Sequence, residues 1–291
     1  MKVKESFEKY FKDIVPDYDL FVKKLFQPMN RTIRCNTLKI NRNSFEEKMK
    51  NGGFSLKRFS WYKEGYEVLE KKVVLGNTLE HFLGYFYVQE KASMLPPIVL
   101  SPTEGENVLD IAASPGSKTS QMAQMMNNKG VILANDFRDD RMKILQINLQ
   151  RLGVMNTVLL KSKGENFWKR GYTFDKVLVD APCTSVGAIR KDPKIMETWN
   201  LTNIKTMSNL QKKILGSAVR STKKGGTLVY STCTLTREEN EDVVESVLDK
   251  VKIVPTGLKF GSRGIDMKHV KRIYPQDIDS EGFFVAKMVK E

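Results

Sequence analysis

The sequence predicts an α/β fold, a mostly parallel sheet with helices, preceded by a smaller α+β domain. Beyond the first hundred residues, short apolar segments alternate regularly with helical ones, which is typical of a parallel sheet. The first hundred residues contain amphipathic helices and alternating β-branched segments without this repeat. Pro96-Pro97 and the polar segment 101–106 separate the two patterns. A chain of 291 residues has room for two domains, which we expect over residues 1–100 and 101–291.

The first domain is predicted to contain helices and short strands in mixed order. Apolar residues at helical spacing indicate two helices within residues 4–27. The alternating, β-branched segment 31–40 predicts a strand. Ser44 and Glu47 form a capping box, which predicts the start of a third helix. Residues 54–75 are expected to form further short strands.

The second domain is predicted to alternate between strands and helices. We expect strands over residues 107–112, 131–136, 157–161, 176–181, 225–233 and 283–289. We expect helices over residues 118–127, 139–152, 203–222 and 237–250, the last preceded by a capping box of Thr236 and Glu239. Ligands of parallel sheets bind at the carboxyl ends of the strands, and the motifs described below follow those ends.

The charge of the chain favours a polyanionic partner. Basic residues exceed acidic ones by 14, and residues 1–75 alone contain 17 basic and 10 acidic residues, which is half of the excess. A pI near 9.5 with basic side chains among aromatic ones fits nucleic acid best. The alternative is a solvated basic surface that keeps the protein soluble.

Composition and cysteine usage exclude several classes of protein. With 41% hydrophobic and 28% charged residues, the chain is neither collagen-like nor mostly disordered. Three widely spaced cysteines without a CxxC pair indicate neither a disulfide framework nor zinc, so we expect reduced thiols, no metal and a cytoplasmic protein. No secretory signal and no apolar segment of about 18 residues is visible, so no membrane association is expected.

The segment DIAASPGSKT (residues 110–119) is a strand that runs into a turn of small residues and a helix. Small residues allow a ligand to approach the backbone, and a helix N-terminus offers N–H groups to an anion. Neither GxxxxGK[ST] nor GxGxxG is present, so a nucleoside triphosphate or a dinucleotide is not favoured. An ordinary turn between strand and helix is the alternative interpretation.

Asp136 ends the next predicted strand, where an acidic residue can accept hydrogen bonds from both ribose hydroxyls. A helix cap or a turn residue is the alternative interpretation for a lone aspartate. Because no phosphate-binding motif accompanies Asp136, a nucleoside cofactor such as S-adenosylmethionine fits better than NAD.

Two cysteines follow the ends of two further strands. Cys183 lies in DAPCTSVG (residues 180–187) and Cys233 in STCT (residues 231–234). A thiolate is a good nucleophile, and neighbouring strand ends would bring both thiols to one cleft. Two buried, small hydrophobic residues are the alternative.

These motifs together resemble a known family. DIAASPGSKT, AND, DAPCTSVG and YSTCTLTREENE are similar to the motifs of the Nop/Sun family of RNA cytosine-C5 methyltransferases. RTIRCNTLK, GYFYVQEKASMLPPIVL, RKDP and EGFFVAK extend the resemblance over residues 31–289 in family order. The compact layout is similar to the archaeal tRNA members. The resemblance implies a Rossmann-like, S-adenosylmethionine-dependent domain behind a small RNA-binding domain.

The resemblance also implies roles for four residues. Cys233 would be the nucleophile that adds to C6 of cytosine, and Asp180 would bind the N3/N4 edge of the base. Cys183 would assist release of the product, and Lys118 would lie near the active site. DNA cytosine methyltransferases use a Pro-Cys thiol as nucleophile instead, so the opposite assignment of Cys183 and Cys233 stays open.

For the cofactor, the resemblance implies a loop, a ribose-binding acid and a basic residue. The loop comprises Ala112, Ala113, Ser114, Pro115, Gly116, Ser117 and Lys118. Asp136 would hold the ribose, with Arg141 and Asp180 beside the cofactor. The family normally places an aspartate after the third strand, to meet the adenine. Lys163 stands at that position here, and Glu165 is the nearest acid.

For the RNA, a target base must leave its stack to reach a thiol. The basic residues that flank the predicted cleft are the candidates for phosphate contacts, with solvated surface charges as the alternative: Arg31, Arg34, Lys39, Arg190 and Lys191. We expect a monomer that acts on tRNA. The rivals are the same chemistry on ribosomal RNA, a catalytically inactive RNA-binding protein of this fold, and a DNA methyltransferase, which would need a target-recognition region not seen here.

Overall fold

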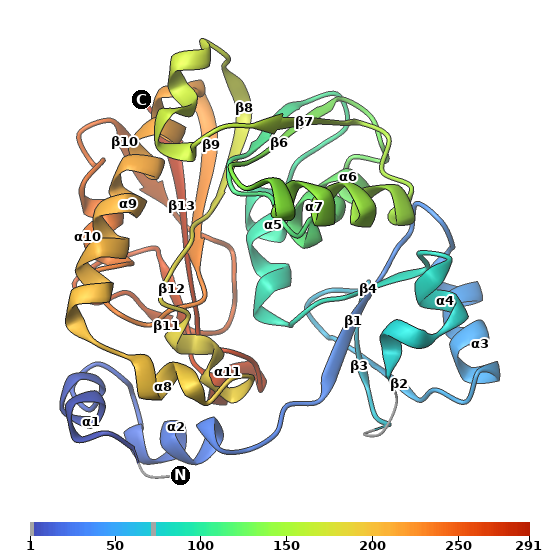
Figure 1. The fold of residues 1–291 in the computed structure, drawn as a ribbon, viewed down its shortest axis with the longest axis horizontal. Helices are drawn as coiled ribbons and strands as arrows, with labels where there is room; N and C mark the ends of the chain where they lie inside the picture. The colour runs from blue at the N-terminus through green and yellow to red at the C-terminus, as the bar shows by residue number, and fades with distance from the viewer. Residues whose placement is uncertain (1–2, 71–73) are drawn as a thin grey trace.

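The computed structural model describes residues 3–70 and 74–291, which form two sheets joined through a continuous chain (Figure 1). The smaller sheet is antiparallel, in the order β2-β3-β1-β4. Its strands are β1 (Arg31–Cys35), β2 (Leu56–Arg58), β3 (Gly65–Val68) and β4 (Phe86–Val88). Helices α3 (Arg42–Asn51) and α4 (Leu79–Phe82) accompany it, and its core is formed by apolar residues such as Ile33, Phe45, Tyr66 and Phe86.

The larger sheet is mixed and has the order β11-β12-β13-β9-β8-β5-β6-β7, with β10 paired to β13. Its parallel strands are β5 (Asn107–Asp110), β6 (Val131–Asp136), β7 (Thr157–Lys161), β8 (Phe174–Asp180) and β9 (Thr222–Thr232). Its antiparallel strands are β10 (Val251–Val254), β11 (Ser262–Arg263), β12 (Lys271–Ile273) and β13 (Phe283–Lys290). The predicted fold class is thereby confirmed.

Helices cover both faces of the larger sheet. α5 (Leu95–Leu100) and α6 (Ser117–Met125) pack on one face, where Leu95, Val99 and Met122 meet Val108 and Val229. α9 (Leu201–Arg220) and α10 (Glu241–Glu245) pack on the opposite face. α7 (Asp139–Leu152) follows β6, and α8 (Lys194–Thr198) precedes α9. α11 (Pro275–Ile278) precedes β13. This sandwich leaves the carboxyl ends of the parallel strands open for ligands.

The first two helices do not pack with the small sheet. Phe7 and Phe11 of α1 (Glu5–Phe11) and Phe21 of α2 (Tyr18–Leu25) share a core with residues of the second predicted domain, Trp199 and Tyr274 among them. In Figure 1 these helices lie below α8 and α11, apart from β1. A division along the chain at residue 100 would also separate α5 from the sheet that it covers. The boundary at residue 100 therefore stays a prediction about the order of the sequence, because residues on both sides of it pack into shared cores.

Two predicted helix starts are wrong. α3 begins at Arg42, and its cap is Asn41, whose side chain accepts a hydrogen bond from the Ser44 amide, rather than Ser44 itself. The predicted helix over residues 237–250 is reduced to α10, Glu241–Glu245. Thr236 donates to the Glu239 side chain instead of capping a helix. Of the strands predicted over residues 54–75, β2 and β3 form, and residues 71–73 lie outside the described residues.

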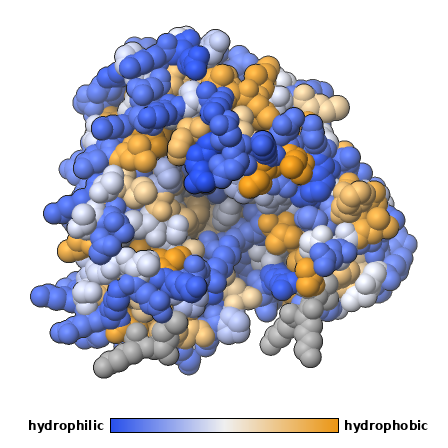
Figure 2. Space-filling model, viewed as in Figure 1, coloured by the Kyte–Doolittle hydropathy of each residue, from blue (hydrophilic) through white to orange (hydrophobic). Residues whose placement is uncertain are grey.

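The face of the molecule shown in Figure 2 is mostly hydrophilic, and its hydrophobic side chains lie in separate groups. This surface agrees with a chain in which 28% of the residues are charged. Among residues 3–70 and 74–291, no helix is long and apolar enough to cross a membrane.

Candidate active site

The site lies where the parallel strands end. Asp180 is the last residue of β8, and Cys233 directly follows β9. The two strands are parallel neighbours in which Asp180 pairs with Ser231, so the turns after them face one another. Cys183 lies in the turn after β8. The prediction that neighbouring strand ends bring both thiols together is therefore confirmed in its geometry.

The two thiols are in direct contact. Cys183 Sγ lies 3.1 Å from Cys233 Sγ, and Ser185 Oγ lies 3.4 Å from Cys233 Sγ. The hydrogen bond from Cys183 lowers the pKa of Cys233, more than burial raises it. The same bond, together with burial, raises the pKa of Cys183 well above its ordinary value. Cys233 is therefore the thiol that ionises more readily, and Cys183 is the one that keeps its proton beside it.

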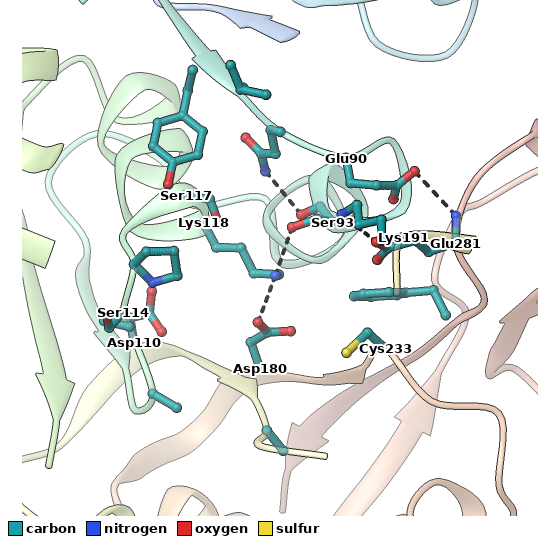
Figure 3. Close-up of a pocket in the computed structure, with 18 residues that line it drawn as sticks. Glu90, Ser93, Asp110, Ser114, Ser117, Lys118, Asp180, Lys191, Cys233 and Glu281 are labelled. Carbon is teal, nitrogen blue, oxygen red and sulfur yellow. Dashed lines mark hydrogen bonds and ion pairs between the residues drawn. The ribbon is translucent and has the colours of Figure 1, made fainter. Parts of the chain in front are cut away.

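Lys118 and Asp180 form a partly buried ion pair near Cys233 (Figure 3). Lys118 Nζ lies 2.7 Å from Asp180 Oδ2 and donates to Ser93 Oγ at 3.0 Å. Ser231 Oγ donates to Asp180 Oδ1 at 2.9 Å. Burial lowers the pKa of Lys118, but the charge and hydrogen bond of Asp180 outweigh it and raise that pKa. The ammonium group therefore stays charged and fixes the carboxylate at the strand end.

A first cavity of about 290 Å³ opens in front of this ion pair. Figure 3 shows Lys118, Asp180 and Cys233 on one side of it and Glu90, Lys191 and Glu281 on the other. Tyr87, Ser93 and Phe283 complete the wall. The cavity offers aromatic surface, charged groups of both signs and one thiol, which suits a planar polar ring.

Glu90 and Glu281 are residues of this cavity that sequence reasoning missed. Glu90 Oε2 accepts from the Ala92 amide, and its Oε1 accepts from the Glu281 amide. Burial and the nearby charge of Glu281 raise the pKa of Glu90 to about 7. Glu281 is paired with Lys191. Both acids lie in motifs that carry the family resemblance, but neither follows a parallel strand, so the strand-end rule does not find them.

A second cavity of about 400 Å³ lies on the other side of Asp180. Its wall contains predicted cofactor residues and both thiols: Ala112, Ser114, Asp136, Arg141, Glu165, Asp180, Cys183 and Cys233. Ala112, Ser114, Asp180 and Cys233 also line the first cavity. Cys233 and Asp180 thus stand between the two cavities, within reach of a ligand in each.

The loop between β5 and α6 forms the common wall of the two cavities. Gly116 has a φ of +101°, a left-handed conformation that favours glycine, and it caps α6. Asp136 Oδ2 accepts from the Ser114 amide at 3.2 Å and from Arg141 Nε at 3.1 Å. Arg141 also donates to the Ser114 carbonyl at 2.6 Å. The loop, the acid that ends β6 and the arginine of α7 are therefore one connected unit.

Unpartnered polar atoms in the second cavity fit a nucleoside. Asn135 Oδ1 and Ser162 Oγ are buried without a hydrogen-bond partner in the described part of the chain, and both residues line this cavity. Glu165 lines it as well, whereas Lys163 is exposed and does not. A buried polar atom without a hydrogen-bond partner destabilises the fold, so a ligand with amine or hydroxyl groups would supply the missing partners.

The RNA-contact prediction is wrong for Arg34. Its side chain is fully buried, and its guanidinium donates to Gln89 Oε1 at 2.9 Å, to Ser120 Oγ at 2.7 Å and to the Ser117 carbonyl at 3.3 Å, besides bonding Gln124. Ile33 and Cys35 point into the core of the small sheet, so Arg34 points to the opposite face of β1, where it bonds residues of α6. A charge count along the sequence does not separate such a residue from a surface arginine.

Arg190 is also engaged within the protein. Its guanidinium donates to the carbonyls of Gln27 and Ser280 and to Asp279, so it joins the segment after α2 to the segment before β13. Arg190 lines a groove together with Arg31 and Lys191, but its side chain is buried and bonded within the protein, so its role as a phosphate contact stays a prediction. This groove shares Gln89, Glu90 and Lys191 with the first cavity. Lys39 is exposed beside Gly153, outside both.

Comparison with known proteins agrees with this geometry. Residues 97–289 match the family described as 16S rRNA methyltransferase RsmB/F. Residues 3–91 match the N-terminal domain of 16S rRNA methyltransferase RsmF. One match ends shortly after β4 and the other begins within α5, ahead of the strands that carry the site.

Individual relatives cover the chain to different extents. The tRNA (cytosine(49)-C(5))-methyltransferase of Pyrococcus abyssi is 41% identical, over 100% of this chain and 99% of that protein. The ribosomal RNA small subunit methyltransferase F of Vibrio cholerae is 42% identical over 93% of this chain, which spans 59% of that protein.

Two solved structures share the whole fold. A methyltransferase homologue from Pyrococcus horikoshii has a TM-score of 0.89 and 36% identity, covering 99% of this chain and 95% of its own. NSun6 from Pyrococcus horikoshii, solved with SFG, has a TM-score of 0.91 and 28% identity, covering 99% and 98%.

The fold and the site define an S-adenosylmethionine-dependent methyltransferase. The chain belongs to the RsmB/F (Nop/Sun) family of RNA cytosine-C5 methyltransferases, as the motifs indicated. Its substrate is RNA, and its reaction is methylation of cytosine at C5.

Proposed function

We propose that the chain methylates a cytosine of tRNA, with Cys233 as the nucleophile. The observation that carries the proposal is the contact between the two thiols, of which Cys233 lines both cavities and Cys183 lines the second. C5 of cytosine is a poor nucleophile by itself. Addition of the Cys233 thiolate to C6 moves an electron pair onto C5 and makes it able to accept a methyl cation. S-adenosylmethionine, when bound, supplies that methyl group.

Release of the product reverses the addition. Once Cys233 is a thioether, it no longer carries the charge that holds the Cys183 proton, and this proton passes to solvent. The Cys183 thiolate then takes the C5 proton, the C5=C6 bond forms again, and the C6–S bond breaks. The electron pair returns to Cys233 as thiolate, so the free enzyme is restored and one proton has been released.

Lys118 supplies the positive charge that stabilises the negative charge which addition places on the ring, and Asp180 fixes the position of Lys118. Lys118 is buried and Asp180 is partly buried, and each of them keeps a fixed position through Ser93 or Ser231. A fixed charge in a site that excludes water stabilises a developing charge more strongly than a mobile one does. We assign Asp180 to the N3/N4 edge of the cytosine and Lys118 to its support.

The second cavity is assigned to the nucleoside part of the cofactor. Asp136 holds the ribose, and Arg141 orients Asp136. The loop from Ala112 to Lys118 surrounds the methionine part. Glu165 and the unpartnered atoms of Asn135 and Ser162 take the place of the aspartate that the family usually has after the third strand.

The first cavity is assigned to the flipped cytosine, and the groove beside it to the RNA backbone. Arg31 and Lys191 line that groove, so they are the basic residues we assign to phosphate contacts, with Lys39 as an outlying one. Each phosphate contact strengthens binding and makes it more sensitive to salt. The flipped base needs a few kcal/mol to leave its stack, which such contacts supply.

The preference for tRNA rests on coverage. The Pyrococcus abyssi tRNA enzyme matches this chain over the full length of both, whereas the chain spans 59% of the Vibrio cholerae ribosomal RNA enzyme. Ribosomal RNA is the second candidate, because the matched family is described by its 16S rRNA members.

The test uses labelled S-adenosylmethionine with two RNAs in parallel, unmodified tRNA and unmodified 16S ribosomal RNA. The expected result is label at C5 of a cytosine in tRNA and none in 16S RNA, with cytosine 49 mapped first because the Pyrococcus abyssi relative is named for it. Label in 16S RNA alone would replace tRNA by ribosomal RNA. If neither RNA is labelled and calorimetry detects no S-adenosylmethionine uptake, the inactive RNA-binding interpretation replaces both.

A further inference from the structure

We propose that Glu239 is the positioning residue that holds the turn of Cys183 against the turn of Cys233, and that product release depends on it. The inference rests on the proposed roles of the two cysteines. Glu239 itself lines neither cavity, and the sequence predicted it only as part of a capping box for a helix that in fact begins at Glu241.

The Glu239 carboxylate is fully buried and receives hydrogen bonds from both turns. Oε1 accepts from the Thr184 amide at 2.9 Å, and Oε2 accepts from the Thr184 hydroxyl. Oε2 also accepts from Thr236 Oγ1 at 2.9 Å and from Thr234 Oγ1 at 3.4 Å. Thr184 directly follows Cys183, and Thr234 directly follows Cys233. One carboxylate therefore joins the residues next to each thiol.

A glutamine of α9 extends this connection to the proline before Cys183. Gln211 Nε2 donates to the Pro182 carbonyl at 2.7 Å and to Glu239 Oε1 at 3.0 Å. Both neighbours of Cys183 in the chain are thus tied, directly or through Gln211, to the same carboxylate. The segment that carries Glu239 is itself fixed, because Tyr230 Oη donates to the Glu239 carbonyl at 2.6 Å.

A second contact between the two turns is made by Gly187, further along the turn that carries Cys183. The Gly187 amide donates to the Cys233 carbonyl at 2.9 Å. A Cβ at Gly187 would lie 1.9 Å from the Gly282 carbonyl oxygen and 2.8 Å from that of Cys233, so only glycine fits there. This contact keeps the two turns together when Glu239 is changed, which leaves the Cys183 side chain as the part that is free to shift.

Loss of the carboxylate should therefore act on release more than on attack. Cys233 follows a central strand whose ladder fixes it on both sides, whereas Cys183 lies in an irregular turn. A misplacement of about 1 Å can cost on the order of a hundredfold in rate. With Cys183 displaced, Cys233 still adds to C6, but the C5 proton has no acceptor and the covalent protein–RNA adduct persists.

The experiment compares Glu239→Ala and Glu239→Gln with Cys183→Ala in the full chain. Each protein is mixed with unmodified tRNA and S-adenosylmethionine, and the covalent adduct is measured on a denaturing gel beside the turnover rate. We expect Glu239→Ala to lose about tenfold to a hundredfold in turnover and to accumulate adduct as Cys183→Ala does. Glu239→Gln keeps one acceptor oxygen and should restore part of the turnover. The double variant Cys183→Ala/Glu239→Ala should accumulate no more adduct than Cys183→Ala alone, because both changes act through one group.

The matched control is Glu241→Gln. Glu241 is equally buried, two residues further on, and its carboxylate bonds Arg272 and the Ile265 amide instead of the thiol turns. We expect it to lower the melting temperature without accumulating adduct.

The outcomes separate this inference from the proposed function. If Cys183→Ala accumulates adduct but Glu239→Ala loses turnover without adduct, in step with its melting temperature, the positioning role is overturned and the roles of the cysteines stand. If Cys183→Ala itself accumulates no adduct, the proposed roles fail, and the role of Glu239 fails with them.

Discussion

Cys183 and Cys233 are separated by 50 residues in the chain, yet their sulfur atoms lie 3.1 Å apart. The contact arises because β8 and β9 are parallel neighbours whose carboxyl ends meet. It places a proton-retaining thiol beside one with a lowered pKa. The pair can therefore divide one reaction between a nucleophile and a proton acceptor, and this division can be tested.

The first prediction concerns the pH dependence of methyl transfer. Cys233 must be a thiolate, so the single-turnover rate should fall as the pH falls through its lowered pKa. Cys183→Ala removes the hydrogen bond that lowers this pKa, so the acid limb of the profile should move to higher pH.

The control is Cys183→Ser, which keeps a hydrogen-bond donor at the same place and should leave the acid limb closer to that of the unmodified protein. Single-turnover rates across the neutral range, with RNA and cofactor saturating, measure the shift. An acid limb at the same pH in Cys183→Ala and in the unmodified protein would show that Cys183 does not tune Cys233.

The second prediction concerns Arg34, whose buried guanidinium makes four hydrogen bonds within the protein. Arg34→Ala removes the donor to the side-chain oxygens of Gln89 and Gln124, whereas the Ser117 carbonyl still accepts from Ser120 Oγ. The free energy of unfolding should therefore fall by about 2–4 kcal/mol. Chemical denaturation measures it.

Arg31→Ala is the matched control, because Arg31 lies on the same strand with an exposed side chain. It should change the free energy of unfolding by less than about 0.5 kcal/mol, while weakening RNA binding and reducing its salt dependence. Equal stability of the two variants would contradict the structural role of Arg34.

The third prediction concerns Glu90, whose pKa is raised to about 7 by burial and the charge of Glu281. Between its ordinary pKa and about 7, the folded protein binds a proton that the unfolded chain has lost. Ionisation of Glu90 therefore removes stability as the pH rises through this range, and the loss is complete above about 7.

Glu90→Gln cannot ionise, so its melting temperature should gain on that of the unmodified protein as the pH is raised from 5 to 8, whatever constant offset the substitution brings. Glu47→Gln, at an exposed position of α3, should follow the unmodified protein. Parallel curves for Glu90→Gln and the unmodified protein would contradict the raised pKa.

Sequence reasoning succeeded where chemistry follows strand ends. Asp180, Cys183 and Cys233 come together because regular alternation of strands and helices places them at one edge, and that alternation is visible in the sequence. Asp136 and Arg141 follow the same logic, since β6 and α7 lie where they were predicted.

Sequence reasoning failed for side chains whose partners are distant in the chain. Glu239 was interpreted through its local spacing to Thr236, although its partners Thr184 and Gln211 are distant in the chain. Arg34 was judged by its charge, although the strand turns its side chain inward. The packing of α1 and α2 against Trp199 and Tyr274 likewise could not be predicted, because the spacing of apolar residues in a helix does not show which distant segment the helix contacts.

The most direct measurement is methyl transfer from labelled S-adenosylmethionine to unmodified tRNA, together with the amount of covalent protein–RNA adduct. It compares Cys233→Ala and Cys183→Ala with the unmodified protein. With Cys233 as nucleophile and Cys183 as proton acceptor, we expect the unmodified protein to transfer a methyl group to C5 of cytosine. We expect neither transfer nor adduct with Cys233→Ala, and a persistent covalent adduct with Cys183→Ala. An active Cys233→Ala together with an inactive, adduct-free Cys183→Ala would contradict the assignment of Cys233 as nucleophile and reverse the roles of the two cysteines.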